Sequence, residues 1–146
     1  MQRGHTMSEL LVTLAVAATL ACISVPGLAW VEGRTAVKAD ARVLALVLRR
    51  AQARAAMSGD MVCVRLDQQG RGYVCEQTAA AVTTVLERGL FHSPCVTNYP
   101  GAAVEFSAWG WPCSLAGEPR AGSFTFASHG ADAAVVLQMG GRVRWQ

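Results

Sequence analysis

The side chains with the strongest chemistry in this sequence are three histidines, and none of them lies in a catalytic pattern. His5, His92 and His129 are far apart in the chain. No GxSxG, HExxH, P-loop or GxGxxG pattern supplies a nucleophile, a zinc site or a phosphate cradle. His92 and His129 are typical of surface or turn histidines, because catalysis needs a nucleophile, a base and an orienting group together. The sequence therefore predicts no enzyme activity, no catalytic residue and no cofactor.

Five cysteines are a second source of chemistry. No two of them form a CxxC pair, which argues against a metal site and against a thioredoxin-like redox site. Cys63 and Cys75 are equally distant from Gln69, so a hairpin centred on Gln69 would make them cross-strand neighbours. This symmetry predicts a Cys63–Cys75 disulfide and leaves Cys95 to pair with Cys113, although four cysteines allow three pairings. The alternative is that these cysteines are buried free thiols.

Two arginines near the end of the chain have a spacing that suits the binding of phosphate groups. Arg142 and Arg144 are two residues apart, so their side chains would project from the same face of a strand. Gly140 and Gly141 leave the approach open, and Arg120 could add a third positive charge. Such arginines bind the phosphates of a nucleic acid without reading its sequence. The alternative is an exposed edge strand protected by its charges, and a net charge of +3 does not by itself indicate a nucleic-acid partner.

These residues belong to a chain with a high apolar content. Apolar residues make up 52% of the 146 residues and charged residues 16%, against about 25% charged in an average soluble domain. The excess is concentrated in residues 10–31, which contain no charged residue over 22 positions. As a helix this segment would be about 33 Å long, enough to cross a bilayer, with a bend expected at Pro26. Length and composition predict one domain on a membrane anchor and argue against disorder and against a cytosolic enzyme.

A secretory signal and a lipoprotein signal fit the apolar segment less well than a retained span does. A cleaved secretory signal has an apolar core of roughly 7–15 residues and a cleavage site of small residues. The run here is longer and ends in Ala29-Trp30-Val31. A lipoprotein signal would place the lipid on Cys22, but the apolar run continues for nine residues beyond it. We therefore expect a retained span in which Cys22 is a small apolar residue.

The residues before the span carry a specific resemblance. Gly4 is followed after four residues by Glu9, which begins the apolar helix "SELLVTLAVAA" with Pro26 near its end. This arrangement resembles the type IV pilins, in which a prepilin peptidase cleaves after the glycine and the new amino terminus is methylated. The resemblance implies cleavage between Gly4 and His5 and methylation of His5. His5 and Ser8 depart from the residues that are usual at these two positions.

The glutamate at the start of the helix sets the register of assembly in this family. The resemblance implies that Glu9 neutralises the cationic amino terminus of a neighbouring subunit, because unpaired charges in or near lipid are costly. The alternative for Glu9 is a carboxylate stabilised by the dipole at the start of a helix. An unrelated protein anchored by a single span is a third possibility, and it would not be cleaved after Gly4.

Beyond the span, the sequence predicts that the helix continues to Met57 and that strands follow. Six apolar residues at helical spacing indicate one buried face: Val37, Ala41, Leu44, Leu48, Ala51 and Ala55. Six basic residues are typical of its solvated side, with a nucleic-acid face as the alternative: Arg34, Lys38, Arg42, Arg49, Arg50 and Arg54. Strands are expected at 61–67 and 73–77 around a turn, then near 81–87, 103–107, 123–128, 133–138 and 142–145. The predicted fold is α+β, a long N-terminal helix packed on an antiparallel β-sheet head domain, as in pilins.

The whole pattern resembles the minor pilin and pseudopilin group called GspH or FimT. It implies a leader at residues 1–4, a long helix at 5–57 with its transmembrane part at about 10–31, and a periplasmic head at 58–146. The implied function is to initiate or cap a type IV pilus or a type II secretion pseudopilus. The implied partners are other pilins or pseudopilins, the prepilin peptidase and the bacterial inner membrane. The alternative is DNA uptake, because Gly141-Arg142-Val143-Arg144 is similar to the DNA-binding tail of the FimT type.

Overall fold

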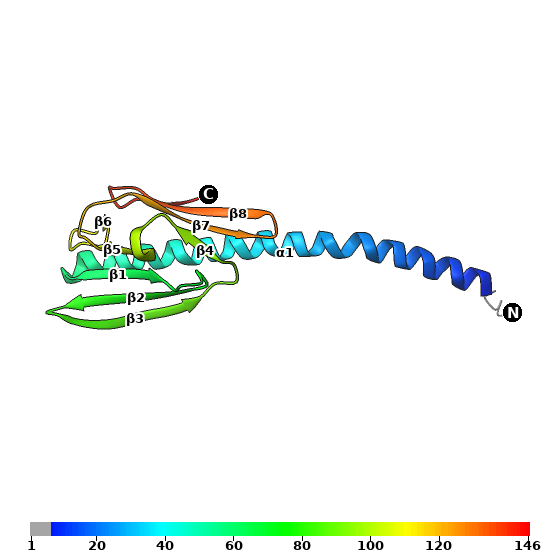
Figure 1. Ribbon diagram of the computed structural model, residues 1–146, viewed down its shortest axis with the longest axis horizontal. Helices are drawn as coiled ribbons and strands as arrows, with labels where there is room; N and C mark the ends of the chain where they lie inside the picture. Colours follow the sequence, from blue (N-terminus) through cyan, green and yellow to red (C-terminus); the bar gives the residue numbers. More distant parts are fainter. Residues whose placement is uncertain (1–6) are drawn as a thin grey trace.

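A computed structural model describes residues 7–146, with only the helical backbone described over residues 23–29. The predicted cleavage and methylation sites at Gly4 and His5 lie outside the described residues. The predicted bend at Pro26 lies in the segment whose side chains are not described. The chain forms one long helix, α1 (Met7–Ser58), followed by nine strands in two antiparallel sheets. The first half of α1 projects as a stalk and the second half packs against the strands (Figure 1).

The projecting half of α1 is apolar and exposed. Every residue from 7 to 22 is exposed in the isolated chain, including Leu11, Leu14 and Leu20. Hydroxyl groups do not interrupt this surface, since Thr13 and Thr19 donate to the carbonyl oxygens of Leu10 and Val16, at 2.9 and 2.8 Å. Across the side chains that are described, α1 has no stretch with both the length and the hydropathy of a membrane span.

The packed half of α1 buries the face that the sequence predicts. The six apolar residues expected on this face, Val37 to Ala55, are all buried. Gly33 is buried as well, because the side chain of His129 lies against it and a Cβ at this position would stand 2.8 Å from the Cβ of His129. The helix ends at Ser58, one residue beyond the predicted Met57, and Gly59 then adopts a positive φ of 75° and donates to the carbonyl oxygen of Ala55.

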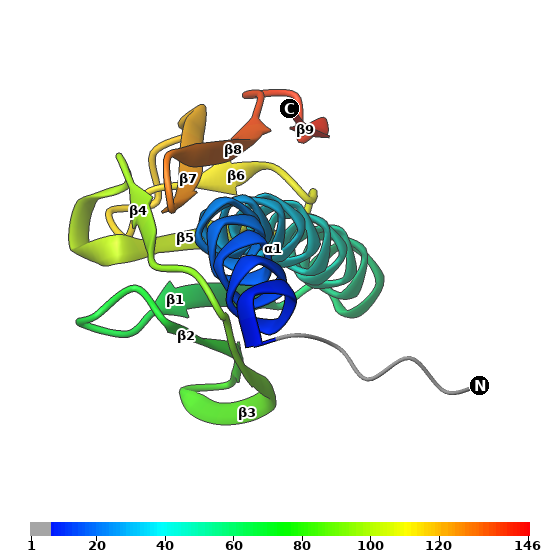
Figure 2. The same ribbon diagram turned by 90° about the vertical axis from the view of Figure 1, so that its right-hand side faces the viewer.

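The strands form two sheets. The first has the order β3-β2-β1-β5-β6, and the second has the order β4-β7-β8-β9. In the first sheet the strands are β1 (Met61–Leu66), β2 (Gly72–Ala79), β3 (Val82–Leu90), β5 (Ala103–Phe106) and β6 (Pro112–Cys113). In the second they are β4 (Cys95–Thr97), β7 (Gly122–Ser128), β8 (Ala131–Leu137) and β9 (Val143–Trp145), and a short 3-10 helix, η1 (Pro100–Ala102), precedes β5. Viewed along the helix, both sheets wrap around the packed half of α1 (Figure 2).

One core joins the helix to both sheets. Leu44 and Leu48 of α1 are buried together with Val62 and Val64 of the first sheet. Phe126 of the second sheet belongs to the same cluster and stacks edge-on against Phe91, with ring centroids 5.0 Å apart. The α+β fold and the antiparallel pairing are therefore confirmed. The sequence predicted one sheet where two are present, and it missed β4 and β6, which are two or three residues long and lie next to prolines.

The predicted Cys63–Cys75 disulfide is wrong by one residue of register. Leu66 pairs with Tyr73, so the hairpin is centred between Gln69 and Gly70, and Cys63 lies opposite Glu76 instead of Cys75. A shift of one residue moves a side chain to the other face of a sheet. Cys75 is buried on the core face, whereas Cys63 lies on the outer face beside Glu105 of β5.

The other predicted pair is also absent from the structure. Cys95 is in the second sheet and Cys113 in the first, and all five cysteines, which are within the described residues, are free thiols. Burial raises the pKa of Cys75 to about 11 and that of Cys95 to about 12. These thiols are therefore protonated at neutral pH, which disfavours thiol–disulfide exchange.

Candidate functional site

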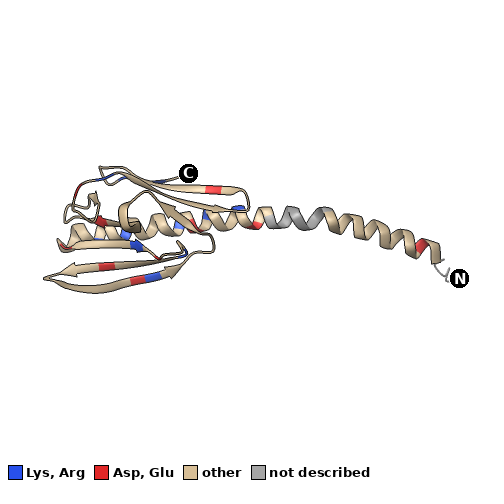
Figure 3. Cartoon of the chain, in the orientation of Figure 1, with Lys and Arg blue, Asp and Glu red and all other residues tan. Residues whose placement is uncertain are grey.

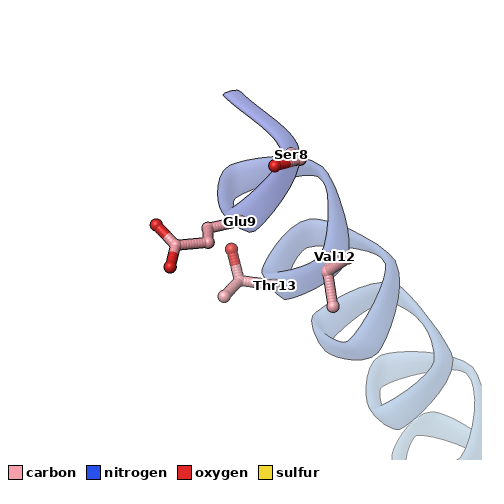
Figure 4. Close-up of a pocket in the computed structure, with 4 residues that line it drawn as sticks. All are labelled: Ser8, Glu9, Val12 and Thr13. Atoms are coloured by element: carbon pink, nitrogen blue, oxygen red, sulfur yellow. The ribbon is translucent and has the colours of Figure 1, made fainter. Parts of the chain in front are cut away.

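The start of α1 presents one carboxylate above a long uncharged surface. Glu9 lies in the first described turn of α1, and no other charged residue follows until Glu32 (Figure 3). Ser8, Glu9, Val12 and Thr13 line a shallow groove on the helix, and the Glu9 carboxylate points away from the helix axis (Figure 4). The N-terminal end of a helix stabilises a carboxylate. In apolar surroundings that carboxylate also requires a cation, so this part of the molecule is suited to pairing with a positive charge.

A second site lies where the end of the chain crosses α1. Arg142 and Arg144 line a polar pocket together with Arg49 of α1, and the remaining lining residues are Val143, Trp145 and Gln146. The Arg49 guanidinium donates to the carbonyl oxygen of Val143 at 3.2 Å, which places its charge next to the two arginines of the tail. The structure thus brings Arg142 and Arg144 together, as predicted, and adds a third arginine.

The tail is fixed in place by hydrogen bonds on both sides. Gln146 exchanges two backbone hydrogen bonds with Ala134 of β8, at 2.8 and 3.0 Å. On the α1 side, the Arg49 guanidinium donates to the tail at Val143, and the Gln52 amide holds the loop between β5 and β6 by donating to the carbonyl oxygen of Gly110 at 2.9 Å. Gly141 has a positive φ of 81°, and a Cβ there would overlap the Gln52 amide nitrogen and stand 3.0 Å from the Gly110 oxygen. A glycine is therefore required at position 141, where two loops and the helix meet.

Arg120 does not take part in this site. Its guanidinium donates to the carbonyl oxygen of Asn98 at 3.4 Å, and its own carbonyl accepts the Tyr99 hydroxyl at 2.9 Å. Arg120 therefore does not line the pocket of the tail arginines. Arg49, in contrast, was expected to lie on a solvated helix face. Its seven-residue spacing from Arg42, which places both on one side of the helix, was the available signal for a basic stripe.

Asp40 is a buried carboxylate that the sequence pattern does not single out. It lies on the packed half of α1 with only 3% of its surface exposed. It accepts the backbone N–H of Ser93 at 2.8 Å and contacts the Nδ1 atom of His92 at 3.3 Å. Because these contacts join the helix to the segment before β4, Asp40 holds the base of the head together. Within residues 7–146, excluding the side chains of 23–29, no group of three histidine, cysteine or acidic residues is placed to hold a metal.

The fold has known relatives among solved structures. No family model and no curated protein sequence matches the chain. The type IV minor pilin FimU of Pseudomonas aeruginosa superimposes with a TM-score of 0.62 at 16% identity, over 77% of this chain and 90% of that one. The minor pseudopilin EpsH of the Vibrio cholerae type 2 secretion system gives a TM-score of 0.59 at 15% identity, over 75% and 94% of the two chains. The chain thus has the fold of minor pilins and pseudopilins, as the resemblance implied.

Proposed function

We propose that this chain is a minor pilin or pseudopilin that initiates or caps the assembly of a type IV pilus or a type II secretion pseudopilus. One observation carries the proposal: half of α1 projects from the head with its apolar side chains exposed and with Glu9 at its start. A contiguous apolar surface of this length requires cover by lipid or by other helices. The fold shared with FimU and EpsH supports the same role.

The projecting half has a different cover before and after assembly. Before assembly, lipid of the bacterial inner membrane covers residues 10–31, and the head lies in the periplasm. A prepilin peptidase cleaves between Gly4 and His5, and His5 becomes the methylated amino terminus. In the filament, neighbouring helices replace the lipid, and the Glu9 carboxylate of one subunit neutralises the terminal amine of another. The chain acts by assembly and not by catalysis.

Two measurements on one set of variants test this proposal. The full chain is produced together with a prepilin peptidase and the other subunits of a pilus or pseudopilus. The mass of the mature chain then shows whether it begins at His5. Recovery of the chain in sheared filaments reports assembly. Gly4→Val is expected to block cleavage, and Glu9→Ala is expected to be cleaved but absent from filaments.

Glu32→Ala is the matched control, since Glu32 is the next carboxylate on the same helix and is exposed. It is expected to assemble like the unmodified chain. Normal assembly of Glu9→Ala would contradict the role proposed for Glu9, and an uncleaved chain that still enters filaments would contradict the proposed processing.

A second candidate function is DNA binding by the tail, in the service of DNA uptake. The observation that favours it is the convergence of Arg49, Arg142 and Arg144 on one polar pocket. Three guanidinium groups held together can contact successive phosphates. Binding would then weaken with salt in proportion to the number of phosphates contacted.

A salt series on the full chain in non-ionic detergent tests DNA binding. A variant with both Arg142→Ala and Arg144→Ala is expected to lose binding to a 20-base-pair duplex and to reduce the salt slope by about two units, one for each lost contact. Arg88→Ala together with Arg120→Ala is the matched control, because these arginines lie outside the pocket. The absence of binding by the unmodified chain at low salt would eliminate this candidate.

A further inference from the structure

A small pocket lies where the head meets the projecting half of α1. Its walls come from α1, from the segment before β4 and from the turn between β7 and β8, which is the part of the head that reaches furthest along the stalk (Figure 1). Its volume of about 200 Å³ has room for one small polar group. We call it the junction pocket, and its polar lining with one glycine consists of Glu32, Gly33, His92, Ser93, Ser128 and His129.

One wall of the junction pocket carries a buried hydroxyl group without a partner. Only 1% of the surface of Ser93 is exposed, and its Oγ atom has no hydrogen-bond partner among the described residues. The backbone N–H of Ser93 donates to Asp40, so the residue is held in place while its hydroxyl group remains unused. Buried polar side chains nearly always have a partner. At the wall of a pocket, this one indicates a ligand that forms a hydrogen bond with it.

Two imidazole rings face the same pocket, and each has one ring nitrogen to spare. The Nδ1 atom of His129 is hydrogen-bonded to the hydroxyl oxygen of Ser128 at 2.8 Å, and the Nδ1 atom of His92 contacts Asp40 at 3.3 Å. Within the described part of the chain, the Nε2 atoms of both rings have no hydrogen-bond partner. Imidazole N–H and hydroxyl groups both donate to the oxygen atoms of a phosphate group. The pocket therefore offers several donors to an anionic group.

The backbone around His129 is unfavourable unless its ring is needed at this place. His129 has a positive φ of 50°, which is uncommon for a residue other than glycine. Gly33, which faces it, is a poorer helix former than alanine, but a Cβ at position 33 would stand 2.8 Å from the Cβ of His129. Both features hold the imidazole ring against α1. Backbone strain of this kind is typical of binding sites.

The junction pocket lies at the height of lipid headgroups when residues 10–31 cross a membrane. Glu32 and Gly33 follow directly after the uncharged run, and the headgroup layer on each side of a bilayer is about 5–8 Å thick, the length of four or five helical residues. Trp30 lies just before the pocket, with the Arg34 guanidinium over its ring at 5.3 Å from the centroid. Tryptophan is typical of the membrane–water interface. A lipid headgroup can therefore reach this pocket.

We propose that the junction pocket binds the phosphoethanolamine headgroup of a membrane phospholipid. The phosphate accepts hydrogen bonds from the Ser93 hydroxyl and from the two imidazole rings, and the ammonium group donates to the exposed Glu32 carboxylate. An anion without an ammonium group would be repelled by Glu32 and by Asp40 behind His92. This charge pattern selects a headgroup that carries both signs. The proposal rests on the proposed function, since it assumes that lipid covers residues 10–31.

Native mass spectrometry of the full chain in non-ionic detergent tests this proposal. The chain is titrated with phosphatidylethanolamine, phosphatidylcholine and phosphatidylglycerol that have the same acyl chains. Phosphatidylethanolamine is expected to bind about tenfold more tightly than the other two, because choline has no N–H to donate to Glu32 and the glycerol headgroup has no positive charge. Ser93→Ala is expected to weaken binding of phosphatidylethanolamine about tenfold, through loss of one hydrogen bond to a charged group. His129→Gly is expected to weaken it as well.

Ser114→Ala is the matched control, because Ser114 is a buried serine of the head outside the junction pocket. It is expected to leave all three affinities unchanged. Ser93→Ala removes a hydroxyl group that has no partner, so it is expected to unfold at no lower temperature than the unmodified chain. Equal binding of the three lipids, or no effect of Ser93→Ala, would overturn the proposal. Displacement of the lipid by an equal concentration of free phosphoethanolamine would also overturn it, because the pocket would then belong to a soluble phosphate ester.

These outcomes are separate from those that test the proposed function, which are cleavage and recovery in filaments. In the filament, neighbouring helices replace the lipid. Glu32→Ala is therefore expected to lose the preference for phosphatidylethanolamine over phosphatidylcholine and still to assemble. A chain that assembles but binds the three lipids equally would overturn the lipid site alone.

Discussion

The two halves of α1 are one continuous helix in two opposite situations. In the packed half, residues such as Leu44 and Leu48 are fully buried against both sheets, and the charged residues other than the buried Asp40 lie on the other sides. In the projecting half, Leu11 and Leu14 are more than 60% exposed, and apolar residues occur all around the helix. A helix with one apolar stripe is matched to a folded domain, whereas a helix that is apolar on all sides requires an apolar environment. The packed half finds its partner within the chain, and the projecting half must find its partner outside it.

The largest expected difference between the halves is in how much a leucine-to-alanine substitution lowers the stability of the head. Leu44→Ala is expected to lower the free energy of unfolding of the head by about 2–5 kcal/mol, because it leaves a cavity in a closely packed core. Leu14→Ala removes the same atoms from the projecting half and is expected to change head stability by less than about 0.5 kcal/mol. Chemical denaturation of the full chain in detergent measures both. Similar losses in the two variants would break the comparison, because the stalk would then contribute to the stability of the head.

Asp40 in the packed half and Glu9 in the projecting half give the next largest contrast. Asp40→Ala leaves the buried Ser93 amide without its acceptor and is expected to cost about 2–3 kcal/mol of head stability. Glu9→Ala is expected to leave that stability unchanged and to affect only assembly. Asp40→Asn serves as the control, since it keeps the acceptor oxygen and is expected to lose less than Asp40→Ala. Equal losses in the two Asp40 variants would show that the charge, and not the hydrogen bond, stabilises the base of the head.

Gly33 lies at the boundary between the two halves, and its substitution by alanine is expected to change the stability of the head by a smaller amount. Alanine is the better helix former by about 1 kcal/mol, but its Cβ would press on the Cβ of His129. We expect Gly33→Ala to cost a net of about 1 kcal/mol, because overpacking outweighs the gain in helix propensity. His129 has a positive φ of 50°, so His129→Gly is compatible with its backbone and removes the clash. The double variant with Gly33→Ala and His129→Gly is expected to be more stable than Gly33→Ala alone. Equal stability of the two would show that the contact between positions 33 and 129 does not set the boundary.

The smallest expected effect is the contribution of the two tyrosines, both in the head, to the pH dependence of its stability, which appears only at high pH. Burial, with a hydrogen bond from Tyr73 to Glu87, raises the pKa of Tyr73 to about 12, and burial raises the pKa of Tyr99 to about 12. The folded state keeps protons that the unfolded state loses near pH 10. The contribution of these two tyrosines to stability is therefore constant below pH 10 and falls between about pH 10 and 12. Absorbance at tyrosinate wavelengths is expected to show no step near pH 10. A step there would indicate a head less closely packed around α1.

The comparison also shows what the sequence could predict. The buried face of α1 was predictable because its apolar residues recur every three or four positions along one segment of the sequence. The uncharged projecting half was predictable because the absence of charged residues can be read directly from the composition of residues 10–31. The register of the β1–β2 hairpin was not, because residues 67–72 allow centres one residue apart, and the packing of both strands against the core selects one. Arg49 and Asp40 were missed because their partners, Val143 and Ser93, lie 94 and 53 residues away along the chain.

One measurement tests the central claim, that the projecting half of α1 is covered by lipid or by neighbouring helices. Cys22 lies in the projecting half and is exposed in the isolated chain. The full chain carrying Val96→Cys as an exposed reference in the head is labelled in native membranes with a polar thiol reagent, and labelling is read for each peptide by mass spectrometry. We predict that Cys22 stays unlabelled until the membranes are dissolved in a denaturing detergent, while the cysteine at position 96 is labelled at once. Equal labelling of the two cysteines in intact membranes would contradict the claim.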